Sequence, residues 1–263
     1  MSAVLTVLIM LPGSVGMHRL LTYRSFECPK WLEHVLVYCG VLSGIGGPRR
    51  MLEVHELRDW CQRQPLCHHF FSHQSNILRD AFWVLNCRCE LDHPPTIQPE
   101  PEFENDRFYW FLDRYWMAAQ MPLAVVLFLI GGWSWCVWGI SVRVAMTHIS
   151  FWGIAYLVHN FGSSDWRVET AGVQGYNVRG LGLILLGEAW HNNHHAFPES
   201  ARFGLKWTQP DPGYWFVVFL QSVGLAWNVK LPEHHPERVE LVALNDRVPD
   251  GMSLNRTVVK GCL

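Results

Sequence analysis

Charged residues are scarce in this chain, and lysine and arginine nowhere form a run. Only 17% of the 263 residues are charged, against roughly 25% in soluble domains, and the net charge is −2. This balance excludes the basic surface that nucleic-acid binding requires. Hydrophobic residues make up 49% of the chain, yet the mean hydropathy is only +0.06. We therefore expect a membrane protein in which long polar segments lie between apolar helices.

The cysteines and the N-terminus lack the marks of a secreted protein. None of the eight cysteines belongs to a Cys-x-x-Cys motif, and several lie in apolar stretches. We expect them to be mostly reduced thiols. The first apolar segment begins without a basic residue and has no small-residue cleavage site, so no signal peptide is predicted.

Long uncharged stretches predict the membrane helices. Residues 115–142 hold no formal charge over 28 positions, and 21 further uncharged residues follow the single Arg143. A spanning helix needs about 20 apolar residues, and the Gly131-Gly132 pair supplies a turn between two helices. We therefore predict a helical hairpin here and a weaker helical pair nearer the N-terminus. The predicted apolar helices lie at about 3–17, 31–46, 114–131 and 136–159.

Polar segments form the rest of the predicted domain, which covers residues 1–232. Residues 47–113 and 160–232 are expected to form a cap on one side of the membrane, followed by a charged, partly unstructured tail over 233–263. Within the cap, the apolar stretches 178–190 and 213–227 predict core or interfacial helices. Basic residues cluster near the ends of the first two apolar segments, which places the capped face in the cytoplasm. The predicted fold class is all-α, a polytopic membrane helical bundle with a cytoplasmic helical cap.

Histidine is abundant and unevenly distributed. Three of the fourteen histidines fall within five residues, at His191, His194 and His195. Residues three or four apart share one face of a helix, so these side chains can converge on a metal ion. The alternative is a set of exposed polar residues at a helix end. Three more predicted ligands stand at ends of apolar segments on the same membrane face: His18, His55 and His159.

Seven other histidines are assigned to roles away from a metal. Five lie in polar or charged segments, where solvated surface is expected: His68, His69, His73, His234 and His235. His34 and His148 lie inside apolar stretches, where we expect hydrogen bonds within the core or between helices.

Five motifs occur together along the chain. They are His18-Arg-Leu-Leu-Thr-Tyr-Arg-Ser-Phe26, Pro29-Lys-Trp-Leu-Glu33, Gly46-Gly-Pro48, His159-Asn-Phe-Gly162 and Gly187-Glu-Ala-Trp-His-Asn-Asn-His-His-Ala-Phe-Pro198. In these motifs the chain resembles the membrane fatty-acyl desaturases of the stearoyl or acyl-lipid type, especially the bacterial and cyanobacterial forms. The resemblance extends from Gly16 to Pro232.

The resemblance implies a di-iron centre held by three histidine boxes and one further histidine. Such a centre activates O2 and removes two hydrogens from a fatty-acyl chain, with electrons from a ferredoxin or cytochrome-type donor. Nitrogen and oxygen ligands with open positions suit non-haem iron. The resemblance also implies that the N-terminal helix of the family is missing or shortened in this chain.

The first two histidine boxes are degenerate in this chain. Where the family has histidine, this chain has Tyr23, Arg58 and Asp59, and where the family has an asparagine for a metal-bound water it has Ala155. Six of the nine expected histidine ligands remain. Phenolate and carboxylate oxygens can bind metals, so Tyr23 and Asp59 are possible replacement ligands. Arg58 cannot ligate, because a guanidinium stays protonated.

The family pattern divides these positions between two irons. One would draw on the positions of His18, Tyr23, His55, Asp59 and His195. The other would draw on the positions of Arg58, His159, His191 and His194. A cation about 4 Å from a metal ion costs several kcal/mol at an effective dielectric of about 20, so we expect the second iron to be lost or weakened. We expect Arg58 to turn away and pair with Asp59, Glu56 or Glu188.

Three functions remain open from the sequence. The chain could be an oxidoreductase that introduces a double bond into a fatty-acyl chain. It could be a catalytically degenerate relative that binds lipid or pigment, or that serves as a subunit of a larger membrane complex. It could also hold a single metal ion, such as zinc, on the surviving histidines.

Overall fold

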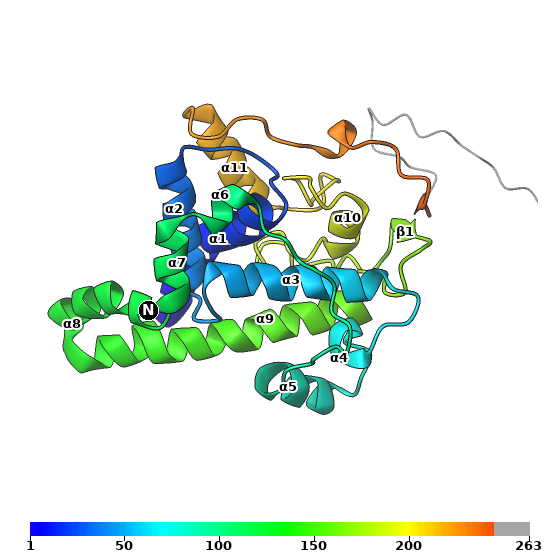
Figure 1. The fold of residues 1–263 in the computed structure, drawn as a ribbon. Helices are drawn as coiled ribbons and strands as arrows, with labels where there is room; N and C mark the ends of the chain where they lie inside the picture. The colour runs from blue at the N-terminus through cyan, green and yellow to red at the C-terminus, as the bar shows by residue number, and fades with distance from the viewer. Residues whose placement is uncertain (245–263) are drawn as a thin grey trace, which may run out of the picture.

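The computed structural model describes residues 1–244, which form a mainly helical protein (Figure 1). Two helical segments are long and apolar enough to cross a membrane, Ser2–Thr22 and Ala118–Asn160. Only 11% of the most apolar window of the second segment is buried inside the protein. An uncovered apolar surface of this kind suits contact with lipid. The helical fold class is confirmed, whereas the four-helix membrane arrangement stays a prediction.

The N-terminal helix packs closely against the next one. Three elements form this region: α1 (Ser2–Ser14), the π-helix η1 (Val15–Thr22) and α2 (Lys30–Val41). A Cβ added to Gly13 would lie 2.9 Å from the backbone nitrogen of Gly40, so only small residues allow this approach. Such small-residue contacts are common between membrane helices. The packing fixes η1, the element that carries His18.

The predicted helical hairpin is present. It consists of η2 (Ala118–Gln120), α8 (Met121–Cys136), the π-helix η3 (Val137–Val142) and α9 (Arg143–Asn160). The backbone leaves helical geometry at Gly131 (φ −145°, ψ 16°) and at Gly132 (φ 65°, ψ −158°). Because a positive φ favours glycine, the chain reverses at the expected pair. In Figure 1 the hairpin projects from one end of the protein, and α9 runs back toward the region of α10.

A fully buried arginine joins the hairpin to α2. Arg143 donates hydrogen bonds to the backbone oxygens of Gly139 and Leu42, at 2.8 and 2.6 Å, and to Oε1 of Gln120 at 2.7 Å. Leu42 caps the C-terminal end of α2. The guanidinium therefore satisfies a carbonyl at the negative end of that helix dipole.

The segment between the apolar regions folds into short helices. They are α3 (Pro48–Arg63), α4 (His69–Ser72), α5 (Ile77–Asn86), α6 (Pro101–Glu104) and α7 (Arg107–Arg114). Pro48 stands in the first turn of α3, where its missing N–H would have no helical partner. The side chains of Asn76 and Asp106 accept hydrogen bonds from the first turns of α5 and α7.

The segment after α9 contains less helix than predicted. Its elements are β1 (Trp166–Val168), α10 (His191–Ala196), α11 (Pro212–Ser222), η4 (Pro232–His234) and β2 (Leu241–Ala243). The prediction of a helix over 178–190 is wrong, because turns with positive φ at Leu186 and Gly187 interrupt this stretch. Within the predicted tail, β2 pairs antiparallel with β1, and the tail beyond residue 244 lies outside the described residues.

A buried ion pair fastens η1 to the C-terminal segment. The Nη2 atom of Arg19, which is fully buried, lies 2.8 Å from Oδ1 of Asp211. The Asp211 carboxylate also accepts backbone N–H groups of Phe203 at 2.7 Å and Tyr214 at 2.9 Å. An interior charge is tolerated only with such partners. The pair holds His18 against the segment that leads into α11.

Candidate metal centre

The six predicted histidine ligands come from four elements and meet in one region. His18 lies on η1, His55 on α3 and His159 near the end of α9. The remaining three lie on α10: His191, His194 and His195. A π-helix such as η1 is frequent at functional sites.

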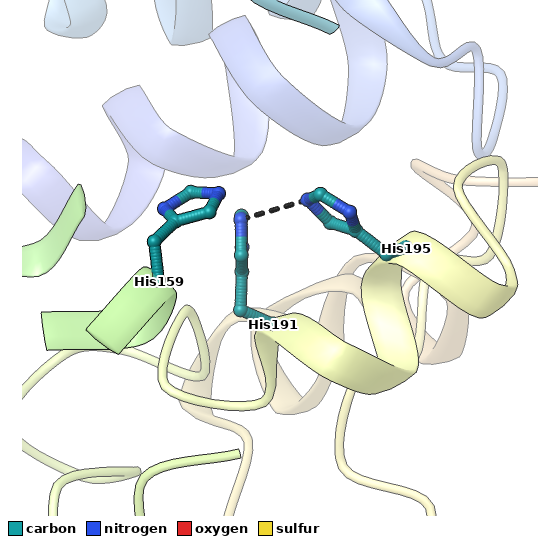
Figure 2. A group of neighbouring side chains, drawn as sticks. All are labelled: His159, His191 and His195. Carbon is teal, nitrogen blue, oxygen red and sulfur yellow. Dashed lines mark hydrogen bonds between the residues drawn. The ribbon is translucent and has the colours of Figure 1, made fainter. Parts of the chain in front are cut away.

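Three of these histidines converge closely enough to share a metal ion. One ligand nitrogen from each of His159, His191 and His195 lies within 4.8 Å of the others. Figure 2 shows the three rings turned toward a common region from α9 and α10. The Nε2 atoms of His191 and His195 are 2.9 Å apart. Metal–nitrogen bonds of about 2.0–2.1 Å place neighbouring ligands about 3 Å apart, so this pair already has suitable spacing.

The orientation of His159 is fixed by its own helix. Its Nδ1 lies 2.8 Å from the carbonyl oxygen of Ala155, to which it donates, and Nε2 is then the nitrogen with a free lone pair. The side-chain nitrogen of Gln62 lies 3.0 Å from this Nε2 and also donates to the carbonyl of Phe71. A metal ion bound at Nε2 would displace the Gln62 amide.

The other three histidines form a second group with Tyr23. The ring centroid of His18 lies 4.7 Å from that of His194 and 4.9 Å from that of His55. The Tyr23 ring lies 4.7 Å from the ring of His194. The four side chains therefore lie side by side, although their ligand atoms do not converge as closely as those of the first group.

The grouping of the rings differs from the division of ligands that the family pattern implies, and that division stays a prediction. His18 was expected to share a metal with His195, whereas the ring of His194 lies beside that of His18 and His195 lies beside His159. The reason lies in helix geometry, because His191 and His195 are four residues apart and their rings lie 4.4 Å from each other. Two members of the group that the sequence predicted to be weakened, His159 and His191, thus converge with His195 within 4.8 Å.

Glu188 orients His18. The Nδ1 atom of His18 lies 2.9 Å from Oε2 of Glu188, and Ser14 donates to the other carboxylate oxygen at 2.8 Å. Burial opposes ionisation of Glu188, yet His18 and Arg19 beside it lower its pKa to about 2. A carboxylate bound to one imidazole nitrogen leaves the other nitrogen for a metal. The sequence analysis treated Glu188 only as a possible partner of Arg58 and missed this role.

The two possible replacement ligands are bonded to each other. The hydroxyl of Tyr23 donates to Oδ2 of Asp59, and Oδ1 of Asp59 lies 3.7 Å from Nδ1 of His55. Burial and the adjacent Asp59 carboxylate raise the pKa of Tyr23 well above its ordinary value. Burial works against the charge of Asp59, but His55 and His195 and the bond from Tyr23 lower its pKa. The pair is therefore a neutral phenol bound to a carboxylate.

The surroundings keep the imidazoles neutral, which is the form that binds metals. Burial lowers the pKa of His55 and of His195 to about 4, and it lowers the pKa values of His191 and His194 well below the ordinary value. The Nδ1 atoms of His55 and His194 are buried without a hydrogen-bond partner. Buried polar atoms are normally paired, so these nitrogens and the Asp59 carboxylate beside His55 fit a site for a cation such as iron.

Arg58 lies near the centre and is half-buried, with its Nε atom lacking a hydrogen-bond partner. Burial lowers its pKa, and the carboxylates of Asp59 and Asp80 oppose this change. Within the described residues, Arg58 forms no ion pair with any of its predicted partners Asp59, Glu56 and Glu188. Glu188 instead pairs with His18.

His73 is a buried histidine that the sequence analysis wrongly placed on the surface. Its side chain is 0% exposed, and its ring centroid lies 5.4 Å from that of His159. The surrounding segment is polar in sequence, but the side-chain amide of Asn160 donates to the His73 carbonyl at 2.8 Å and holds it against α9. No signal in the sequence distinguishes His73 from its exposed neighbours His68 and His69.

The two histidines predicted to form core or interhelical hydrogen bonds do so. His34 bonds Asp106 through Nε2 at 2.8 Å, and His148 bonds the carbonyl of Gly44 at 2.9 Å. Of the two predicted in the tail, His234 is exposed and His235 is half-buried.

A small cleft opens beside both histidine groups. His194 and His195 lie in its wall, together with the Tyr23–Asp59 pair. Arg238, which lines the cleft, donates to the carbonyls of His195 and of the residue that follows it. The segment before β2 thus closes over the end of α10.

Comparison with known proteins decides the family, although no protein-family model matches the chain. An sn-1 stearoyl-lipid 9-desaturase of Anabaena variabilis is 37% identical over 230 residues, which cover 84% of this chain and 79% of that protein. A Synechocystis protein of the same name is 33% identical, over 83% of this chain and 67% of its own. Delta-9 acyl-lipid desaturase 1 of Arabidopsis thaliana is 34% identical, over 86% and 72%. The chain belongs to the fatty-acyl desaturase family.

Membership confirms the resemblance that the sequence motifs carry, and it makes this chain a desaturase-like protein of lipid metabolism. Proteins of this family associate with membranes and use a di-iron centre. The assignment of individual ligands, and of Tyr23, Arg58, Asp59 and Ala155 as substituted positions, stays a prediction.

Proposed function

We propose that this desaturase-family protein introduces a double bond into the fatty-acyl chain of a membrane lipid. The observation that carries the proposal is the convergence of six histidines from η1, α3, α9 and α10 in one region with orphaned, neutral imidazole nitrogens. Iron bound there would supply the oxidising power that an unactivated C–H bond requires. The acyl chain loses two hydrogens, and O2 becomes two waters with two protons and two electrons from a ferredoxin or cytochrome-type donor.

The chain's own residues have separate tasks in this proposal. His159, His191 and His195 would hold one metal ion, and His18, His55 and His194 would hold the other. Glu188 and the Ala155 carbonyl fix the tautomers of His18 and His159. The low pKa values of the imidazoles on α10 keep protons from competing with the metal at neutral pH.

We further propose that the apolar helices span the membrane with the histidines on its cytoplasmic side. From the hairpin turn to Asn160 the chain is continuously helical and rises about 40 Å. The hydrocarbon core is about 30 Å thick. The end of this helical run, which carries His159, would therefore project beyond the lipid into the cap.

The test is expression in a bacterial host that lacks this desaturation and is supplied with ferredoxin and its reductase. Fatty acids of the membrane lipids are then analysed for new double bonds. We expect product from the wild-type chain and from His69→Ala, an exposed control, and none from His191→Ala. Equal fatty-acid profiles with and without the wild-type chain, at verified membrane levels of protein, would overturn the proposal.

Two contacts favour a second function, that of a catalytically degenerate relative. Tyr23 and Asp59 satisfy each other, and Gln62 bonds the free nitrogen of His159, so three ligand positions have partners within the chain. Such a protein would bind a lipid or pigment, or serve as a subunit of a larger membrane complex. It would form no unsaturated product, and it would purify with a stoichiometric partner.

A further inference from the structure

His73 has the surroundings of a metal ligand rather than of a core residue. Its Nδ1 lies 3.2 Å from Oδ2 of Asp80, and its Nε2 is buried without a hydrogen-bond partner. The indole of Trp152 donates to the same carboxylate oxygen at 2.7 Å. A carboxylate on Nδ1 that leaves Nε2 free is the usual arrangement around metal-bound histidines.

The backbone fixes His73 beside the His159 group. His73 adopts a left-handed conformation, φ 57°, which a non-glycine residue rarely takes without a local reason. Asn160, the residue after His159, holds the His73 carbonyl at 2.8 Å. The rings of His73 and His159 are 5.4 Å apart and inclined by 30°. The strained turn thus presents this imidazole to the end of α9.

Besides orienting His73, Asp80 also affects the charge of Arg58. Its Oδ1 is buried without a hydrogen-bond partner, as is Nε of Arg58. The Asp80 carboxylate acts on the charge of Arg58, and Arg58 in turn acts on His73 and His159. The two side chains form no ion pair, so the Asp80 charge offsets only part of the repulsion between Arg58 and a cation near His159.

We propose that His73, oriented by Asp80, is a further ligand of the metal bound by His159, His191 and His195. It replaces the imidazole that the family has at the position of Arg58. The inference rests on the proposed function, because it needs a metal at this group. The Nε2 atom of His73 lies outside the 4.8 Å group, so its side chain rotates inward when the metal displaces Gln62.

The test measures metal affinity of the full-length protein in detergent, and it does not depend on turnover. Co(II) alone is titrated anaerobically and followed by its absorption, and Fe(II) is counted by elemental analysis. We expect His73→Ala to weaken binding at least tenfold and His69→Ala, the exposed control, to leave it unchanged. His73→Asn keeps an amide donor near the position of Nδ1, and with it the bond to Asp80, and it should weaken binding as His73→Ala does.

The same variants made in an Arg58→His chain distinguish a metal ligand from a residue that only stabilises the fold. In an Arg58→His chain the family ligand is restored, so His73→Ala should change affinity less than threefold. An unchanged affinity of His73→Ala and His73→Asn in the wild-type background would overturn the inference, as would an equal loss in both backgrounds. His191→Ala distinguishes the two proposals. If it abolishes binding while His73→Ala does not, only the role of His73 fails; if it also changes nothing, the metal centre fails as well.

Discussion

The hydrogen bond between Tyr23 and Asp59 allows a quantitative prediction for the first and second histidine boxes. Tyr23→Phe keeps the aromatic ring and removes the hydroxyl, which leaves Asp59 with His55 3.7 Å away. A hydrogen bond to a charged group contributes about 1.5–3 kcal/mol to stability. Because 22% of the Asp59 side chain is exposed to solvent, we expect a loss of about 2 kcal/mol. The midpoint of thermal unfolding in detergent should fall by about 4–8 °C.

Restoring histidine at both positions should have the opposite effect on metal binding. Tyr23→His together with Asp59→His replaces the self-satisfied pair by two imidazoles beside His18, His55 and His194. Elemental analysis after anaerobic loading with Fe(II) should then show about one additional ion per chain. Each single variant should bind less additional iron, because the remaining Tyr23 or Asp59 side chain still stands where the family has an imidazole. Tyr115→His, at an exposed tyrosine, is the matched control.

Two results would refute this reasoning. A folded double variant that binds no more iron than the wild-type chain would show that these positions do not face a metal. A Tyr23→Phe protein with an unchanged unfolding midpoint would show that the hydroxyl does not stabilise Asp59. The two measurements are independent, so the structural bond and the ligand assignment can fail separately.

Two further predictions concern stability. Asp211→Asn removes the charge that faces the fully buried Arg19, and we expect the free energy of unfolding to fall by about 3–5 kcal/mol in thermal unfolding. The control Glu233→Gln, in a surface pair, should change this free energy by less than about 0.5 kcal/mol. Similar values for both variants would contradict the prediction. The second concerns pH: the pKa values of His55 and His195 are about 4 in the folded protein against 6.5 ordinarily. The unfolded chain therefore binds more protons between these pH values, so the unfolding free energy of the metal-free protein should decrease as the pH falls from 6.5 toward 4, by up to about 2.7 kcal/mol per pH unit for the two groups. Unfolding midpoints that stay constant between pH 7.5 and pH 5 would contradict this.

The sequence allowed the hairpin turn to be predicted, because this part of the fold depends on neighbouring residues along the chain. The hairpin turn at Gly131-Gly132 followed from an uncharged stretch too long for one span and from a residue pair that tolerates positive φ. The prediction for residues 178–190 failed because an apolar stretch of that length does not distinguish a helix from packed turns. Helical periodicity predicted that the histidines of α10 lie near one another, and two of them, His191 and His195, belong to the close group.

Other features of the site depend on packing between distant segments. Which of His194 and His195 faces η1 is set by the rotation of α10 against α9, and no spacing in the sequence encodes this angle. The burial of His73 depends on Asn160, 87 residues away along the chain. A polar segment can be solvated or folded inward, and only its tertiary partners decide between the two.

The substituted positions differ in their surroundings. Tyr23 faces Asp59 as donor and acceptor, so these two side chains satisfy each other without a metal, while the Nδ1 atoms of His55 and His194 beside them lack a hydrogen-bond partner. Among the described residues Arg58 forms no ion pair, and the Asp80 carboxylate offsets only part of its charge. A free imidazole, His73, lies beside His159. The two metal positions therefore need not share one fate, and the group on α9 and α10 can retain a metal even where the group on η1 and α3 does not.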